Sequence, residues 1–382
     1  MMRPMKLAGS ELMFGEGCLD YIKTIKTKKV SIVVGGKSME KSGMLKKVED
    51  LFHEAGAETM VISGVEPDPS FQTVLRGANE MLEFGPDLIV GLGGGSAMDA
   101  AKGMWIFYEH PEFKKMEDVL PPNAFPALRG KARLCCIPST SGTASEVSRS
   151  IVISDNETGM KHGIGNMEMM PDIAICDPVV TVSMPAKITA ETGMDAMTHA
   201  LEALASNRAN YLSDILASQA VIDILKYLPR AVADGNDIEA REYMLQASMV
   251  AGIAFTNVSL GIVHSMAHTL GGFFHVAHGL ADAILLPYIM RYNSASEAGK
   301  DAYARISAKA GVDDIVTAVE ELNKKIGIPT CFAEIIPDEK AYMDKVKEMA
   351  PVAKADGCTK TNPIIPEVEG FEELFIKVYK GV

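Results

Sequence analysis

The chain has no apolar run that approaches the roughly 20 residues of a membrane span. Its first residues, Met-Met-Arg-Pro-Met-Lys, soon turn polar and lack the apolar core of a secretory leader. We therefore expect a protein of the cytoplasm that does not insert into membranes.

Cysteine and positive charge are also scarce. The six cysteines are scattered over 382 residues without a C-x-x-C pair, so we expect reduced thiols, mostly in the core, and no disulfide framework. The 37 basic residues are outnumbered by 50 acidic ones, and a net charge of −13 repels nucleic acid and anionic membranes. The expected partner is a small molecule.

What is present is a composition typical of globular proteins and a change of pattern near the middle of the chain. The length suffices for two cores of ordinary size. In the first half, short β-rich runs alternate with helical patterns, which predicts βαβ units around a parallel sheet. The strands are expected at 30–34, 58–62 and 88–90, with further runs at 134–137, 151–153 and 173–176, and the helices at 43–53, 70–83 and 98–108.

From about Thr189 onward the pattern is helical almost without interruption. Helices are expected at 189–205, 214–228, 238–256, 261–273 and 282–292. The alternation stops near residues 180–187, so we predict an α/β domain over 1–184 and an all-helical domain over 185–382.

A glycine-rich turn, Gly91-Leu-Gly-Gly-Gly-Ser96, lies between an expected strand and a helix that is expected to begin near Met98. Backbone N–H groups of such a turn can face a phosphate, and glycine permits its close approach. The spacing is not the G-x-G-x-x-G of the usual dinucleotide fingerprint, and a purely structural turn explains this turn, taken alone, equally well.

Two more turns follow strands. Pro138–Glu146 offers clustered hydroxyls for a phosphate or ribose, although a helix cap with Glu146 as the capping acid is the more common use of such a segment. The other turn, Val34–Ser38, ends the first strong strand, where folds of this kind meet the adenosine ribose. Gly36 replaces the acidic residue typical of NAD sites, and Lys37 and Ser38 suit a 2′-phosphate. NADP(H) is the expected cofactor, with NAD(H) as the alternative; a solvent-exposed lysine is the competing explanation.

The helical half contains a candidate metal site. Asp195 and His199 are four residues apart and project from one helix face. Residues 261–279 hold four of the eight histidines in an otherwise apolar stretch. A lone histidine there, such as His275, is more often a core residue, but four of them with Asp195 favour Fe²⁺ or Zn²⁺. Spacing does not decide which of the four bind: His264, His268, His275 or His278.

Taken together, these segments resemble the iron-dependent alcohol dehydrogenase family. The resemblance rests on Gly93–Ser96 followed by Asp99, on Pro138–Glu146, on Gly193-Met-Asp-Ala-Met-Thr-His199 and on the four-histidine segment, in this order along nearly the whole chain. It implies a dinucleotide-binding domain with a parallel sheet, followed by an all-α metal-binding domain, which is the architecture shared with dehydroquinate synthase.

Carried over by position, the resemblance also implies roles for single residues. The metal ligands would be Asp195, His199, His264 and His278, and His268 would lie near the substrate and aid proton transfer. Gly94, Gly95 and Ser96 would meet the pyrophosphate, and the cofactor would also lie along Thr140, Thr143 and Lys161.

Gly35-Gly-Lys-Ser38 is similar to the NADPH-preferring butanol dehydrogenase and aldehyde reductase members, which commonly have a third glycine where this chain has Lys37. Near the carboxyl end, Cys358–Pro363 resembles a family segment that continues with arginine, but Ile364 follows here, so that arginine's role is not carried over.

The function expected from this resemblance is hydride transfer between NAD(P)H and a small aldehyde or alcohol, with the metal polarising the substrate oxygen. A homodimer or larger homo-oligomer is implied by the family alone. One alternative is a lyase similar to dehydroquinate synthase, but residues 251–286 contain no Lys or Arg to hold a multiply charged substrate. The other alternative is a non-enzymatic sensor of cofactor or metal.

Overall fold

The computed structural model describes residues 5–120, 123–154 and 161–382. Contacts between residues divide the chain into two units, Met1–Met184 and Pro185–Val382. Pro185 immediately precedes the first helix of the second unit, as its amino-terminal cap.

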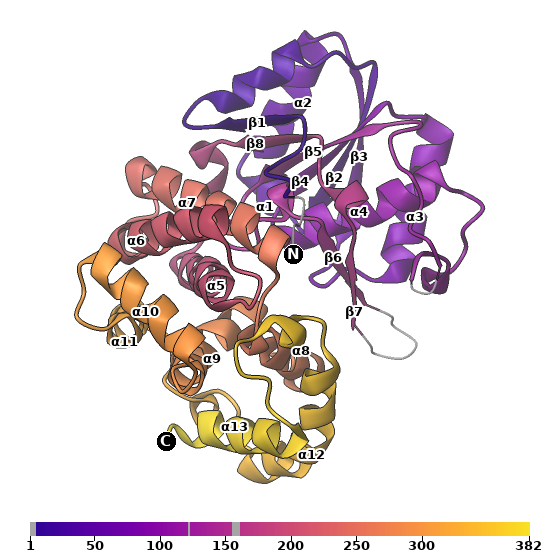
Figure 1. The fold of residues 1–382 in the computed structure, drawn as a ribbon. Coiled ribbons are helices and arrows are strands. Elements are labelled where there is room, and N and C mark those ends of the chain that lie inside the picture. Colours follow the sequence, from indigo (N-terminus) through magenta and orange to yellow (C-terminus); the bar gives the residue numbers. More distant parts are fainter. Residues whose placement is uncertain (1–4, 121–122, 155–160) are drawn as a thin grey trace. The chain divides into compact units, whose positions relative to one another are not determined.

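The first unit is built on a parallel six-stranded sheet with the order β1-β8-β5-β4-β2-β3 (Figure 1). Its strands are β1 (Glu11–Phe14), β2 (Lys29–Gly35), β3 (Glu58–Val65), β4 (Leu88–Gly93), β5 (Arg133–Pro138) and β8 (Ile173–Cys176). The helices of this unit are α1 (Ser38–Lys41), α2 (Met44–Glu54), α3 (Phe71–Phe84) and α4 (Gly95–Glu109). The predicted parallel sheet is confirmed.

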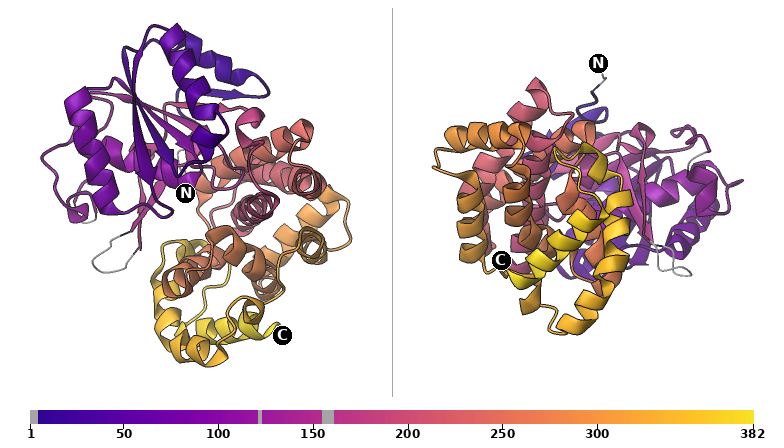
Figure 2. Two further views of the ribbon diagram at one scale, coloured as in Figure 1. Left: turned by 180° about the vertical axis from the view of Figure 1, so that it is seen from behind. Right: turned by 60° about the horizontal axis from the view of Figure 1, so that its bottom comes forward.

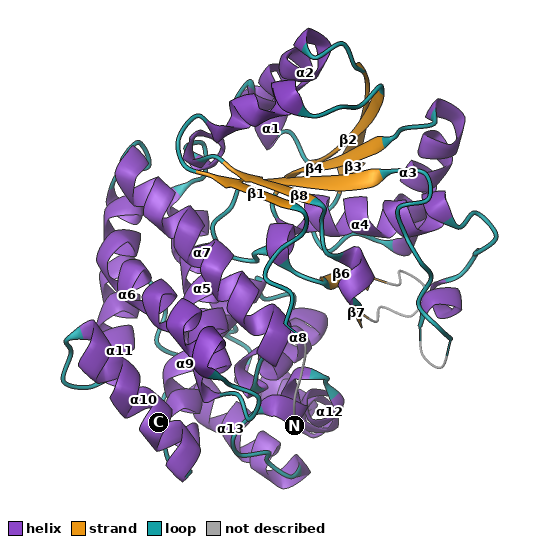
Figure 3. Cartoon of the chain, turned by 45° about the horizontal axis from the view of Figure 1, so that its top comes forward, coloured by secondary structure: helices purple, strands orange, loops and turns teal. Residues whose placement is uncertain are grey.

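Alternating side chains of the strands fill two cores, one on each face of the sheet. On β2, Ile32 and Val34 belong to the core that includes residues of α2, whereas Val33 belongs to the core that includes residues of α3 and α4. Figure 3 shows the sheet between α2 on one face and α3 and α4 on the other. Both faces are therefore buried, which explains why the strands are apolar throughout.

Two parts of the first unit differ from the sequence-based expectation. The apolar run at 151–153 is a strand, but β6 (Ser150–Ser154) pairs antiparallel with β7 (Lys161–Gly165) outside the main sheet. Strand β1 was not predicted, because Glu11–Phe14 is short and lies at the sheet edge, where only β8 pairs with it.

The second unit contains helices and no strand over residues 185–382, all of which are described. The all-α prediction is confirmed. Its helices are α5 (Ala186–Ala205), α6 (Tyr211–Ala233), α7 (Ile238–Val258), α8 (Ile262–Phe274), α9 (His278–Asn293), α10 (Glu297–Ala310), α11 (Ile315–Ile326), α12 (Glu339–Ala355) and α13 (Val368–Lys380).

Helix α5 is the central helix of this unit. It packs against α6, α7, α9 and α10, and Figures 1 and 2 show it enclosed by neighbouring helices. From Thr189 to Ala205 nearly every residue of α5 is buried, polar ones included. A helix covered on all sides places any charged side chain it carries in the protein interior.

All six cysteines are free; Cys135, Cys136 and Cys176 are buried and the other three are partly exposed, so only half lie in the core.

Within the described residues, no single helix is long and apolar enough to cross a membrane; α7 and α8 satisfy that criterion only as a pair, and the chain bends by 101° between them.

Candidate metal centre and nucleotide-binding turns

Asp195 and His199 lie one turn apart on α5 and point to the same place. His199 Nε2 is 3.5 Å from Asp195 Oδ1, and both side chains are about 95% or more buried. The His199 ring stacks on Phe255 of α7, with ring centroids 4.3 Å apart. The buried position of α5 therefore provides one carboxylate and one imidazole with little exposure to water.

Two histidines from α8 and α9 complete this cluster. His264 Nε2 lies 3.7 Å from Asp195 Oδ1, and His278 Nε2 lies 3.9 Å from the same oxygen. The rings of His199 and His264 stack with centroids 4.7 Å apart. The structure thus brings together all four residues that the resemblance implies as metal ligands.

The ligand atoms of this cluster fit a divalent cation. Asp195 Oδ1 and His264 Nε2 are buried and have no hydrogen-bond partner among the described residues. Bonds of about 2.1 Å to one ion place two ligand atoms roughly 3 to 4 Å apart, which is the range observed here. Burying these polar atoms without a partner is costly, and a bound cation would remove that cost.

Asp282 also faces the cluster, and the sequence analysis missed it. It lies one turn after His278 on α9, and its Oδ2 is 3.2 Å from His278 Nε2 and 3.9 Å from His264 Nε2. The sequence does contain a signal, since Asp282 is the one charged residue in the apolar run Ala281–Leu286.

Glu202 fixes the orientation of the His264 ring through the nitrogen that does not face the cluster. Its Oε2 is 2.7 Å from His264 Nδ1 and also accepts the backbone N–H of Gly261, while Oε1 accepts that of Val263. A carboxylate at Nδ1 makes this nitrogen the donor and leaves Nε2 free to bind a metal. Glu202 was not predicted, because its partner is 62 residues away along the chain.

His268 is held beside the cluster by Asp356. Its Nδ1 is 2.8 Å from Asp356 Oδ2, and its ring stacks on His278 with centroids 5.3 Å apart. The backbone N–H of Cys358 donates to the other oxygen of Asp356 at 2.7 Å. His268 is 32% exposed, so it is the histidine of this group that solvent or a substrate can reach together with His278.

His275 lies apart from the cluster. It caps the carboxyl end of α8 with a φ of 54° and is exposed, so the expectation of a core histidine is wrong for this residue. Its conformation ends the helix between His268 and His278.

The pKa values of Asp195 and His264 are shifted in opposite directions. Burial alone raises the pKa of Asp195, but attraction to the imidazoles of His199, His278 and His264 outweighs this effect and lowers the pKa below its usual value. Burial alone lowers the pKa of His264, and the carboxylates of Asp282, Glu202 and Asp195 more than reverse this effect. In the absence of metal, the carboxylates of the cluster therefore favour a positive charge beside them.

In the first unit, the glycine-rich turn joins β4 to α4. The helix begins at Gly95 rather than near Met98, because Gly94 already serves as its amino-terminal cap. A Cβ on Gly94 would lie 3.3 Å from Thr140 Cγ2, and one on Gly95 only 2.8 Å from Thr143 Cγ2. The turn after β4 and the turn after β5 thus lie side by side, and no side chain fits between them.

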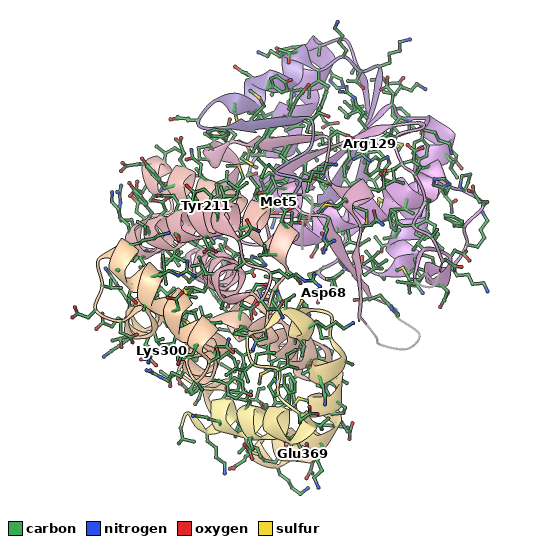
Figure 4. All side chains as sticks on the ribbon, in the orientation of Figure 1. Met5, Asp68, Arg129, Tyr211, Lys300 and Glu369 are labelled. Carbon is green, nitrogen blue, oxygen red and sulfur yellow. The ribbon has the colours of Figure 1, made fainter. Side chains whose placement is uncertain are left out.

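Hydrogen bonds tie these two turns to their surroundings. Figure 4 labels Asp68, whose backbone N–H donates to Ser96 Oγ at 3.3 Å. Asp99 on α4 accepts a hydrogen bond from Ser145 at 2.8 Å. Thr140 Oγ1 is buried and without a partner among the described residues, so a hydroxyl is available where the turns meet. The expected capping box at Glu146 is absent, since Ala144 caps the short helix Ser145–Val147 without a side-chain bond.

A buried lysine stabilises the second turn. Lys102 is completely buried, and its Nζ donates to Ser145 Oγ and to the carbonyl oxygens of Ser148 and Ser150 at 2.9 to 3.2 Å. Glu146 is 2% exposed, and burial raises its pKa to about 7. Lys102 thus holds the turn, and neither Lys102 nor Glu146 faces solvent.

The remaining predicted nucleotide residues lie near the end of β2. Gly36 has a φ of 47°, which favours glycine, and Gly36, Lys37 and Ser38 are all exposed at the start of α1. Lys161 begins β7, but its side chain lies outside the described residues.

Comparison with known proteins gives matches over nearly the whole chain. The iron-containing alcohol dehydrogenase family matches residues 9–178, and the carboxyl-terminal part of the Fe-containing alcohol dehydrogenase family matches residues 189–379. The NADPH-dependent butanol dehydrogenase of Clostridium saccharobutylicum is 43% identical over 380 residues, covering 97% of each chain.

Two further matches are a longer relative and a solved structure of similar length. The aldehyde-alcohol dehydrogenase 2 of Entamoeba histolytica is 39% identical over 97% of this chain, which spans only 46% of that longer protein. Among solved structures, the iron-containing alcohol dehydrogenase of Thermococcus thioreducens superimposes with a TM-score of 0.92 at 35% identity, covering 99% of this chain and 100% of that one.

Proposed function

Because the chain belongs to the iron-containing alcohol dehydrogenase family, and is thus an oxidoreductase acting on alcohols or aldehydes, we propose that it reduces short aldehydes with NADPH. Asp195, His199, His264 and His278 would hold the metal, with Fe²⁺ preferred over Zn²⁺. We further propose that the enzyme works in the cytoplasm as a homodimer or larger homo-oligomer.

The convergence of buried donor atoms on one point supports this proposal most directly. Asp195 Oδ1 and His264 Nε2 are unpartnered and buried, and His199 and His278 lie within 3.9 Å of the same oxygen. When bound, the cation supplies Lewis acidity and the nicotinamide nucleotide supplies the hydride. The protein's part at this place is to fix three imidazoles and a carboxylate around one point, with Asp195, His199 and His264 buried and His278 accessible to a substrate.

The paired turns after β4 and β5 would bind the nucleotide phosphates. Backbone N–H groups at Gly94, Gly95 and Ser96 stand at the amino end of α4, where the helix dipole favours an anion. Thr140 and Thr143 contribute hydroxyls beside these glycines, and Lys161 would border the same site.

Lys37 and Ser38 are proposed to select NADPH over NADH. Both are exposed at the carboxyl end of β2, and Gly36 leaves no carboxylate to repel a 2′-phosphate. The likeness to the NADPH-dependent butanol dehydrogenase agrees with this preference.

His268 is the proposed proton donor to the product oxygen. Asp356 accepts from Nδ1, so Nε2 is the atom that can give a proton to a substrate. Asp356 itself is held in its ionised form, since the hydrogen bond with His268 lowers the pKa of Asp356 despite burial, which raises it.

The test is oxidation of NADPH and of NADH by protein purified without oxygen and loaded separately with Fe²⁺ or Zn²⁺, using short aldehydes as substrates. Strong turnover with NADPH and Fe²⁺ is expected. Turnover without net consumption of nucleotide would instead support a lyase, and a folded, metal-loaded protein inert with every aldehyde would refute the proposed function.

A further inference from the structure

Asp282 is buried beside His264 and His278, and no hydrogen bond among the described residues holds it there. Its side chain is 0% exposed, and neither carboxylate oxygen has a hydrogen-bond donor among the described residues. An isolated carboxylate in the interior is strongly unfavourable unless a cation compensates it. On α9, the residues from Ala283 to Pro287 are apolar, and His278, one turn before Asp282, is itself one of the proposed metal ligands.

The position of Asp282 Oδ2 is that of a metal-binding atom. It lies 3.2 Å from His278 Nε2 and 3.9 Å from His264 Nε2, and one ligand atom each of Asp195, His264, His278 and Asp282 fall within 4.8 Å of one another. These separations match those expected around a single ion with bonds of about 2.1 Å. The group that satisfies this distance includes Asp282 and does not include His199.

We propose that Asp282 binds the same metal ion as Asp195, which makes the centre one of three imidazoles and two carboxylates. This inference rests on the proposed function, since it concerns the ion of that site. Two carboxylates balance the charge of a divalent cation. Five protein ligands suit a six-coordinate ion with one position left for substrate, and they disfavour Zn²⁺, which usually takes four ligands.

A competing explanation is that Asp282 is protonated and donates a hydrogen bond to Asp195. The substitution Asp282→Asn separates the two, because an asparagine amide can replace the donor but not the charged ligand. Glu191→Gln is a matched control, since Glu191 is a buried carboxylate one turn before Asp195 on α5 that is not part of the cluster.

The experiment measures Fe²⁺ and Zn²⁺ affinity of the wild type and both variants by competition with a chelator, together with the visible spectrum of the Co²⁺-loaded proteins. For Asp282→Asn we expect Fe²⁺ affinity to fall by more than about tenfold, Zn²⁺ affinity to fall less, and the cobalt spectrum to shift towards fewer ligands. Glu191→Gln should retain the wild-type values.

Wild-type affinity and an unchanged cobalt spectrum in a folded Asp282→Asn protein would overturn the inference and leave the proposed function intact. A wild-type protein that binds no metal would instead refute the function itself. If Asp282→Asn does not fold, a crystal structure of the Fe²⁺-loaded wild type decides: Oδ2 within about 2.4 Å of the iron supports the inference, and a separation beyond about 3 Å overturns it.

Discussion

Glu202 Oε2 lies 2.7 Å from His264 Nδ1 and accepts the backbone N–H of Gly261 at the same time. One carboxylate therefore fixes both the first turn of α8 and the ring orientation of a proposed metal ligand. Partners of this kind commonly change metal affinity by 10 to 100-fold when they are removed.

The first prediction follows from this contact. Glu202→Ala should lower metal affinity by roughly 10 to 100-fold, because His264 loses its orienting acceptor. Glu202→Gln, whose side-chain oxygen still accepts, should lose less. Metal content after dialysis against a graded chelator series measures both, and equal affinities of wild type and Glu202→Ala would contradict the assigned role.

A second prediction concerns the nucleotide-binding turns. Gly95→Ala should raise the KM for NADPH by about tenfold or more, because the new Cβ would meet Thr143 at 2.8 Å and force the turns apart. Metal content should not change. Gly163→Ala on β7 is the control, since a Cβ there meets nothing within 4 Å. Nucleotide kinetics that are the same for both variants would exclude a phosphate site at this turn.

The third prediction tests cofactor selection. Lys37→Ala should raise the KM for NADPH by roughly tenfold, which corresponds to about 1.4 kcal/mol, and should leave the KM for NADH unchanged. Lys41→Ala, at the end of the same short helix, should affect neither. A parallel rise for both nucleotides in Lys37→Ala would argue against a 2′-phosphate contact.

A fourth prediction concerns the buried lysine of α4. Lys102→Met should lower the free energy of unfolding by on the order of 3 kcal/mol, because Asp99 and the acceptors at Ser145, Ser148 and Ser150 lose their buried cation. Urea unfolding monitored by circular dichroism measures this loss. Lys46→Met, at an exposed ion pair, should leave stability unchanged. A wild-type midpoint for Lys102→Met would show that the lysine contributes nothing net.

The fifth prediction is a pH dependence due to Glu146. Its pKa is raised by burial from 4.5 to about 7 in the folded protein, so the folded state holds a proton that the unfolded state releases between these values. This group's contribution to stability is therefore present below pH 4.5 and lost as the pH rises through 7. Because each pH unit corresponds to about 1.4 kcal/mol, the loss is on the order of 3 kcal/mol.

Glu146→Gln removes this titration. The stability of Glu146→Gln relative to the wild type should increase between pH 4.5 and 7 and stay constant above pH 8. Unfolding free energies of both proteins across this pH range provide the measurement. Parallel pH profiles would mean that Glu146 is ionised in the folded state at neutral pH.

The sequence predicts most elements of the first unit and helices α5 to α9 of the second, because strands buried on both faces and long amphipathic or buried helices leave clear patterns. Helices α10 to α13 were not predicted individually. It predicts β6 as a strand but not its partner, since β7 (Lys161–Gly165) carries two glycines and few apolar residues. Strand β1 was not predicted for a related reason, because a four-residue edge strand has too little periodicity to be identified from the sequence.

The residues of the candidate site were likewise predicted only in part from the sequence. Asp195 and His199 can be predicted because their spacing places them on one face of one helix. The histidines of 261–279 can be predicted because the composition of that segment is unusual. Glu202 and Asp356 are not, because they meet His264 and His268 across 62 and 88 residues of chain. Only the packing of the helices brings these carboxylates to the histidines.

The proposed function depends most on a metal held by the histidine cluster, and one variant tests this directly. His264→Ala, purified without oxygen and offered Fe²⁺, should lose most bound metal and NADPH-linked aldehyde reduction together while retaining the wild-type circular dichroism spectrum. Full activity in a metal-free His264→Ala protein would contradict metal-dependent catalysis by this cluster.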